Sequence, residues 1–460
     1  MVEDNDKNRQ WHKRLSHADS RRNAVRELEN LPEAELGDIL QVLKLEDIVE
    51  VMSLLREEKQ GSALASFDIS RRLEIFHNVS RKWFAALFEK MPSDARADTF
   101  QQLDTQGRVS LLPYLHKTVR EDVLKLSAYP HDTAGGIMST DFAIISENLN
   151  CEQALQQLRQ EVPHDKMLYH LYVVDEGMRL KGFMTLKELV ISEPKESVSS
   201  IMRRDFPLAR LDEDRETVAK KIEKYDLLAL PVVNEENQLM GIVHQDDAIE
   251  VIRAEQTEDM EKFMGIIPGS EILNYNQTSV AGHFRKRIIW LAILTVVGFV
   301  SGLIIRQYEE ALSALMILAL YIPMMADTGG NSGSQAATVV IRAMALGQLT
   351  TANWLNILFK EWRISMLLGT VLGVIAFAMI IVISRDSAAA LEHGLGFIAF
   401  GIALALALQV VTSTIIGAAL PLLVNRLGGD PAVAASPAIT TVVDITGLLI
   451  YFGVATLLFF

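Results

Sequence analysis

The C-terminal part of the chain limits its fold more than any other feature, because it is mostly apolar. Five apolar stretches lie there, at residues 288–305, 311–326, 364–384, 395–424 and 438–460. About 20 apolar residues in a helix are enough to cross the hydrocarbon core of a bilayer. The second stretch is short and is interrupted near its end by Pro323, and the fourth is long enough to tilt or to kink at Pro421. The sequence therefore predicts a transmembrane domain of five helices.

Charge is divided unevenly between this apolar part and the rest of the chain. The 460 residues include 44 Lys and Arg and 58 Asp and Glu. From Val280 onward there are nine basic and eight acidic residues, which leaves 35 basic and 50 acidic residues before it. The two parts thus carry net charges of +1 and −15. An acidic surface does not suit the phosphates of nucleic acid, but it attracts cations.

The short loops of the membrane part differ in their content of Lys and Arg, and cytoplasmic loops usually hold the excess. One side has only Arg306 and Arg385. The other side has seven basic residues: Arg285, Lys286, Arg287, Arg342, Lys360, Arg363 and Arg426. The first residues of the chain are polar and contain no apolar signal segment. We therefore expect the acidic N-terminal half in the cytosol and Phe460 on the outer side.

A polar, glycine-rich run with the sequence DTGGNSGSQ follows the second apolar stretch directly, at residues 327–335. Non-helical backbone at membrane depth is tolerated only where protein or a water-filled cavity satisfies its polar groups. Broken helices with small polar residues often build ion sites in transporters. We expect this run to be non-helical, and it is either part of such a site or an ordinary interfacial loop.

Asp444 is a carboxylate inside the fifth apolar stretch. It lies seven residues after Pro437, which places it roughly 10 Å into a helix. An ionised carboxylate there costs about 3 kcal/mol on insertion scales, so it should face a pathway or a partner. The fifth stretch contains no Lys or Arg to pair with it. Two readings remain open, a carboxylate that meets an aqueous cation and a structural aspartate that is protonated or hydrogen-bonded within its helix.

The soluble half contains an internal repeat with an offset of 59 residues. YVVDE at 172–176 leads through LKGF to LKEL, and PVVNE at 231–235 leads through LMGI to QDDA. Each copy predicts a strand, a turn, a second strand and a helix. The repeat resembles a tandem pair of CBS (cystathionine-β-synthase) domains. Such pairs are regulatory modules in unrelated proteins, so the resemblance implies control rather than chemistry.

The remaining soluble segments are expected to be helical. Apolar residues between 23 and 128 recur at steps of three and four, with charges between them. A second helix, from Asp246 to Met264, carries many carboxylates at mutually destabilising spacings. Its charges either form an ordinary solvated helix face, or the helix connects the soluble half to the membrane part and a bound divalent ion could hold it in place. The soluble half has no dinucleotide or phosphate-loop fingerprint and no nucleophile constellation, and its only cysteine, Cys151, excludes an internal disulfide and a cysteine-based metal site. We expect no enzyme activity.

Two stretches in the membrane part, 322–342 and 430–452, closely resemble the signatures of MgtE magnesium transporters. The order of segments also resembles that family. It implies a multidomain membrane protein with a flexible N-terminus (1–20), an all-α N domain (21–130), an α/β tandem CBS pair (131–250, dividing near 195), a connecting plug helix (251–280) and a five-helix transmembrane domain (281–460). The resemblance further implies a homodimer in a bacterial-type inner or plasma membrane, embedded in lipid, with a pore on its two-fold axis.

The same resemblance implies which residues bind ions. The pore aspartate corresponds to Asp444, with Asn331 and Thr440 as further lining, and Asp327 adds a carboxylate near the same path. Cytosolic Mg²⁺ sensing is implied at interfaces between the N, CBS and plug elements. Its acidic positions correspond to Asp94, Asp98, Asp214, Glu216, Asp226, Asp247, Glu250, Glu255, Glu258, Asp259 and Asp430. Mg²⁺ is then both transported and regulatory, and binding of ATP in the CBS pair is a further implication.

The resulting expectation is a Mg²⁺-gated channel that imports magnesium and closes when cytosolic Mg²⁺ is plentiful. Three positions depart from the pattern: Glu250 stands where Asp is expected, Ser334 where some members have Asn, and Asp327 where some have Gly. These departures leave selectivity for magnesium open. Two other functions also remain open, a coupled carrier or exchanger of Mg²⁺ or of Mn²⁺ or Co²⁺, and a membrane sensor that binds metal without conducting it.

Overall fold

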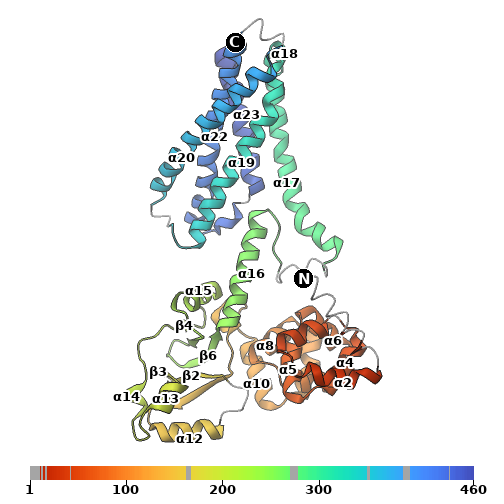
Figure 1. Ribbon diagram of the computed structural model, residues 1–460, viewed down its shortest axis with the longest axis vertical. Coiled ribbons are helices and arrows are strands. Elements are labelled where there is room, and N and C mark those ends of the chain that lie inside the picture. The colour runs from red at the N-terminus through yellow and green to blue at the C-terminus, as the bar shows by residue number, and fades with distance from the viewer. Residues whose placement is uncertain are drawn as a thin grey trace. The chain divides into compact units, whose positions relative to one another are not determined.

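The computed structural model describes residues 11, 14–15, 18–41, 43–161, 167–269, 278–349, 353–386, 394–434 and 436–460. Most of the predicted flexible N-terminus and part of the predicted connector, at 270–277, lie outside these residues. The chain divides into two compact units, Met1–Arg253 and Ala254–Phe460. Each unit is described by itself (Figure 1).

The first unit begins with a stack of short helices, which confirms the all-α N domain. These are α2 (Ala18–Leu28), α3 (Glu33–Gln41), α4 (Leu45–Leu54), α5 (Glu57–Ala65), α6 (Ile69–Asn78), α7 (Arg81–Phe88), α8 (Ser93–Gln102), α9 (Thr105–Leu111), η1 (Leu112–Tyr114) and α10 (Lys117–Leu126). Polar residues cap the N-terminal ends of some of these helices. The side chain of Ser80 accepts a hydrogen bond from Trp83 N, and that of Asp104 accepts one from Gly107 N. One apolar core that includes Phe76, Phe84 and Phe88 unites the stack.

The repeat forms two three-stranded sheets, which confirms the tandem CBS pair. The first copy contains α11 (Ala134–Ile137), β1 (Phe142–Ser146), α12 (Cys151–Glu161), β2 (Met167–Val174), β3 (Leu180–Thr185) and α13 (Leu186–Ile191). The second contains α14 (Val198–Ile201), β4 (Ala209–Arg210), α15 (Arg215–Tyr225), β5 (Ala229–Val233), β6 (Leu239–His244) and the start of α16 (Gln245–Phe263). In each sheet the first two strands are parallel and the last two antiparallel. Strands β3 and β6 begin at residues 180 and 239, the 59-residue offset of the repeat.

The N domain and the second CBS copy share buried apolar residues. Ala97 of α8 and Leu126 of α10 belong to one cluster with Val218 of α15 and Val243 of β6. This cluster removes apolar surface from water on both sides of the boundary. The end of the N domain and the beginning of α16 are therefore held in fixed positions within the first unit.

The second unit consists mainly of long helices, drawn side by side in Figure 1. These are α17 (Val280–Gln307), α18 (Glu309–Ala314), α19 (Ile317–Ala345), α20 (Trp354–Ile383), α22 (Leu395–Arg426) and α23 (Ser436–Phe459). In the described residues α17, α20, α22 and α23 are long and apolar enough to cross a membrane. The helix α19 has 29 residues, but its centre is polar and glycine-rich. Five membrane helices remain a prediction.

The expected non-helical run at 327–335 is wrong, because these residues lie inside the continuous helix α19. The predicted second span, 311–326, also has the wrong limits, since α18 ends at Ala314 and α19 continues to Ala345. The glycines serve packing instead of a loop. A Cβ on Gly417 of α22 would lie 2.0 Å from the carbonyl oxygen of Gly333. Small residues let helix backbones approach this closely in a membrane, and the helix satisfies its own backbone groups.

Candidate functional site

Asp444 lies in the first half of α23 and is partly buried. Its Oδ1 atom is inaccessible to solvent and has no hydrogen-bond partner among the described residues. One turn earlier, the Thr440 hydroxyl donates to Ser436 O at 3.0 Å, so it is already satisfied within the helix. The Thr440 side chain also packs against Gly330 of α19. The geometry therefore gives Asp444 an oxygen with unused capacity to bind a cation.

The helix α19 has two different faces beside Asp444. Gly329 and Gly333 are buried, whereas Asp327 and Asn331 are exposed on the opposite side of the helix. Residues four apart lie one above the other on a helix, so Asp327 and Asn331 form one polar stripe. A carboxylate and an amide facing lipid are costly. This stripe fits a water-filled path or a contact with a second chain better than it fits lipid.

The end of α16 reaches this part of the second unit. Phe263 packs against the cluster of Ala337, Ile439 and Val443. Two of these residues belong to α23, and Val443 immediately precedes Asp444. Beyond the helix, Ile267 N donates to Lys286 O in α17 at 3.0 Å. The C-terminal end of the charged helix therefore contacts the helix that carries Asp444.

Lys262 joins two of the predicted sensor carboxylates. Its Nζ donates to Asp430 Oδ2 at 2.7 Å and lies 2.8 Å from Glu258 Oε1. Burial lowers the pKa of Lys262, but the two carboxylates outweigh burial, so the pKa is raised overall. Asp430 also accepts from Ala432 N at 2.9 Å and begins the short helix η3 (Pro431–Val433). A divalent ion does not fit between Glu258 and Asp430 while the ammonium occupies that position.

Four other predicted sensor residues meet within the first unit. Asp94 and Asp98 are in the first turns of α8, and Asp247 and Glu250 are in the first turns of α16. Burial, and then neighbouring carboxylates such as Asp94, raise the pKa of Asp247 to about 8. Burial also raises the pKa of Asp98 to about 6, although the nearby His131 lowers it. Burial raises the pKa values of Asp94 and Glu250 in the same way.

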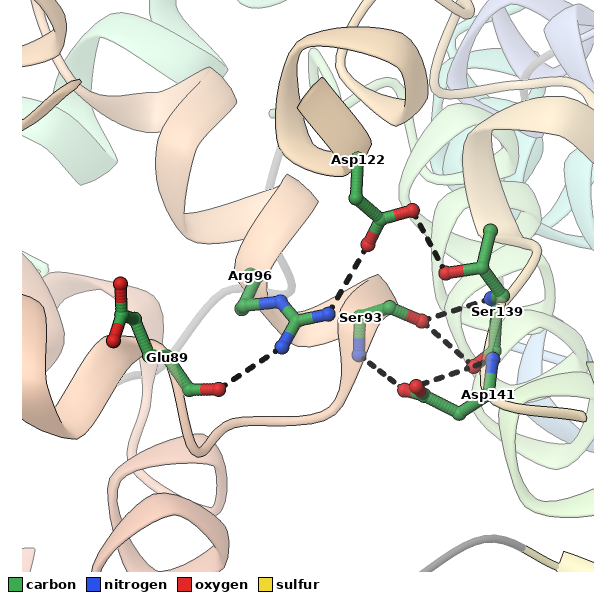
Figure 2. A network of polar contacts seen from close by, with 7 residues as sticks. Glu89, Ser93, Arg96, Asp122, Ser139 and Asp141 are labelled. Atoms are coloured by element: carbon green, nitrogen blue, oxygen red, sulfur yellow. Dashed lines mark hydrogen bonds and ion pairs between the residues drawn. The ribbon is translucent and has the colours of Figure 1, made fainter. Parts of the chain in front are cut away.

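A network of hydrogen bonds joins the start of α8 to Ser139 and Asp141 (Figure 2). Ser93, beside Asp94, donates its N–H to Asp141 Oδ2 at 2.8 Å, and its Oγ lies 2.9 Å from Ser139 Oγ. Ser139 in turn exchanges backbone hydrogen bonds of 2.7 and 2.9 Å with Ile242 of β6. The helix α16 begins three residues after Ile242. Hydrogen bonds through Ser93, Ser139 and Asp141 therefore hold the start of α8 beside the start of α16, and the carboxylates of the two helices lie near one another.

Arg96 and Asp122 extend the network in Figure 2 within the N domain. Arg96 Nη1 donates to Glu89 O at 3.1 Å, and its Nη2 donates to Asp122 Oδ2 at 3.1 Å. Asp122 Oδ1 accepts from Thr140 Oγ1 at 2.9 Å. None of these residues is among the sequence predictions. An ion pair between residues 26 positions apart gives no periodic signal, so sequence reasoning alone does not find these residues.

The acidic cluster suits a hydrated cation better than a bare one. Within the described parts of the chain no three Asp, Glu, His or Cys side chains converge closely enough to enclose a metal. Burial is the main cause of the raised pKa values, and the nearby Arg72 and His131 offset it only in part. Mg²⁺ dehydrates reluctantly and is usually held by one or two carboxylates with several waters. Residues Asp94, Asp98, Asp247 and Glu250 therefore fit a hydrated Mg²⁺ as a bridging charge.

The remaining predicted sensor residues are not brought into this cluster. Asp214 caps α15, where its Oδ2 accepts from Thr217 N at 3.0 Å, and Glu216 pairs with Lys220 at 2.6 Å. Asp226 ends the same helix with a left-handed backbone, φ +51°. Glu255 and Asp259 lie on α16, in the part that belongs to the second unit.

The comparisons with known proteins identify the family. A family model described as a divalent cation transporter matches residues 322–454. Models of the MgtE intracellular N domain and of the CBS domain match residues 31–132, 134–192 and 198–254. Over 448 residues, which are 96% of each protein, the chain is 34% identical to the magnesium transporter MgtE of Thermus thermophilus. The chain belongs to the MgtE family.

The chain is also similar to a second curated relative and to two solved structures. The magnesium transporter MgtE of Bacillus subtilis is 32% identical over 93% of this chain and 89% of its own length. A crystal structure of the soluble part of a magnesium transporter is 25% identical, covers 55% of this chain and 98% of that one, and has a TM-score of 0.50. The cytosolic domain of the Mg²⁺ channel MgtE in complex with ATP covers 51% of this chain and 95% of that one, at 31% identity and a TM-score of 0.48. MgtE proteins are transporters, which confirms that the chain is not an enzyme.

Proposed function

We propose that this MgtE protein is a Mg²⁺-gated divalent-cation channel that imports magnesium across a bacterial-type inner or plasma membrane. The channel is a homodimer in lipid, with its N-terminal half in the cytosol and its C-terminus outside. Its domains have the boundaries predicted from the sequence, with the plug region from 251 to 280. The ion passes Asp444, lined also by Asn331, Thr440 and Asp327.

One observation carries this proposal. In the second unit, a membrane helix holds Asp444, one of whose carboxylate oxygens is buried and has no hydrogen-bond partner among the described residues, and Phe263 packs against the residue beside it. A carboxylate with no cationic partner in a membrane helix indicates an ion pathway. An apolar side chain from the end of α16 at the same level indicates a plug that can hinder the ion.

The acidic cluster of the first unit supplies the control. Bound Mg²⁺ would neutralise the carboxylates of α8 and α16 and so stabilise the closed state. Without that charge, Asp94 and Asp98 repel Asp247 and Glu250, and this repulsion disfavours the arrangement in which they meet. The population can shift only if the closed state binds ions better than the open one. The other predicted sensor positions, and ATP binding in the CBS pair, remain predictions.

Flux into liposomes tests the proposal. Uptake of Mg²⁺, Mn²⁺, Co²⁺ and Ca²⁺ is measured with the wild type and with Asp444→Ala, and we expect Asp444→Ala to abolish uptake. Uptake that strictly requires a counter-ion would show a coupled carrier. Unchanged uptake by Asp444→Ala would refute the assigned path, and a wild type that binds but does not conduct would be a sensor.

A further inference from the structure

Gln409 is a buried polar residue near the middle of α22, and packing does not explain why this position is polar. Its side chain is 1% exposed. Neither Nε2 nor Oε1 has a hydrogen-bond partner among the described residues. A buried amide without partners destabilises a protein, whereas an apolar side chain of the same shape does not. Methionine would fill the same volume, so stability does not explain the glutamine.

The Gln409 carboxamide lies in a gap between two helices that only glycine permits. A Cβ on Gly329 of α19 would lie 2.2 Å from Gln409 Nε2, and a Cβ on Gly447 of α23 would lie 2.1 Å from the same atom. These separations are far below van der Waals contact. Two glycines on two different helices thus make room for one amide nitrogen, and the amide passes from α22 into the seam between α19 and α23.

This seam lies beside the proposed ion path. Gly447 comes three residues after Asp444 on α23, which places it about 4.5 Å further along the axis and roughly 60° around the helix. The unpartnered Oδ1 of Asp444 is a hydrogen-bond acceptor inside the protein. The unpartnered Nε2 of Gln409 is a donor. Among the described residues, a donor without a partner therefore lies against α23 one turn from an acceptor without a partner on that helix, and the two atoms do not hydrogen-bond to each other in this structure.

We propose that Gln409 is a positioning residue of the ion path. Its amide N–H donates to Asp444 Oδ1 when the other carboxylate oxygen faces the hydrated ion, and so fixes the orientation of that oxygen. This inference rests on the proposed passage of the ion at Asp444. Outer hydrogen-bond partners of this kind orient metal-binding groups and tune affinity.

The test uses full-length protein in liposomes and measures Mg²⁺ uptake over a concentration series. Gln409→Met keeps the volume and removes the donor. We expect its half-saturating Mg²⁺ concentration to rise about tenfold, with less discrimination against Ca²⁺ and an unchanged or higher melting temperature. Leu406→Met is the matched control, because Leu406 is on the same helix and only 2% exposed. It should leave half-saturation unchanged.

A second pair of variants separates hydrogen bonding from packing. Gly447→Ala displaces the amide and should also raise half-saturation. The double variant Gly447→Ala, Gln409→Ala relieves the clash but has no donor, so its half-saturation should stay high. Wild-type half-saturation in the double variant or in Gln409→Met would overturn the inference, as would a lower melting temperature with only the maximal flux reduced. If the ion does not pass Asp444, Asp444→Ala takes up Mg²⁺ as fast as the wild type, and this outcome is distinct from the results for Gln409.

Discussion

Replacing Lys262 by methionine should release the end of α16 from the rest of the second unit. The ammonium lies 2.7 Å from Asp430 and 2.8 Å from Glu258, and its side chain is 23% exposed. Methionine keeps the apolar stem but leaves two carboxylates facing each other. The ion pair thus changes from an attraction into a repulsion at the same position.

The magnitude follows from the burial of the three side chains. Exposed ion pairs contribute about 0–1 kcal/mol, and breaking a fully buried pair costs about 3–5 kcal/mol. Glu258 and Asp430 are 32% and 35% exposed, which places this group between the two classes. We expect a loss of about 2 kcal/mol in docking free energy, a factor of roughly thirty in the equilibrium.

Limited proteolysis in the absence of divalent ions measures this docking. A glutamate-specific protease is required, because the substitution removes a tryptic site. Cleavage between α16 and α17 should be up to about thirty times faster in Lys262→Met, since the rate follows the open population when closing is fast. Added Mg²⁺ should slow the cleavage again, because the freed carboxylates can then bind it.

The matched control is Lys220→Met, which removes the ion pair with Glu216 on α15. That pair has the same spacing along its helix as Lys262 with Glu258, but it does not join two helices. It should leave cleavage unchanged. Equal cleavage of Lys262→Met and the wild type without divalent ions would refute the tether.

Three further predictions concern the acidic cluster and the membrane helices. The raised pKa values of Asp98 and Asp247 mean that the folded state favours their protonated forms, so their contribution to stability is present at low pH and lost as pH rises through about 6 and 8. Without Mg²⁺, the melting temperature should therefore fall as the pH rises through these values. Added Mg²⁺ should reverse the fall. Gly417→Ala should cost about 1–3 kcal/mol through a clash with α19, measured by thermal unfolding in detergent, whereas Gly298→Ala, which meets nothing within 4 Å, should cost little. Asp444→Asn should remove Mg²⁺ flux in liposomes without loss of folded protein, and retained flux would contradict the need for a charge.

The parts of the fold that could be predicted are those with a strong local pattern. Four of the five apolar stretches, the helical period of the N domain and the 59-residue repeat each predict their elements directly. The run at 327–335 could not be predicted correctly, because glycine disfavours an isolated helix. Here it is favoured by backbone contact with α22, and that contact depends on residues about 80 positions away in the sequence.

The candidate site was predictable to a similar degree. Asp444 stood out because a carboxylate in an apolar stretch has no local partner. Lys262 did not, since its partner Asp430 is 168 residues away, although its spacing from Glu258 was visible. Gln409 also escaped notice, because a single amide in a long apolar segment is unremarkable until the glycines around it are known.

The helix α16 belongs to both units, since its 19 residues begin at Gln245 and the division between the units falls after Arg253. It can therefore act as a rigid lever about 28 Å long. A tilt of about 10° at its first turn would move the far end, at Phe263, by about 5 Å, given a rise of 1.5 Å per residue. That displacement is comparable to the width of a side chain. Under the proposed gating, small changes in the spacing of the carboxylates at one end of α16 would be enlarged into a movement large enough to clear an aromatic ring at its other end.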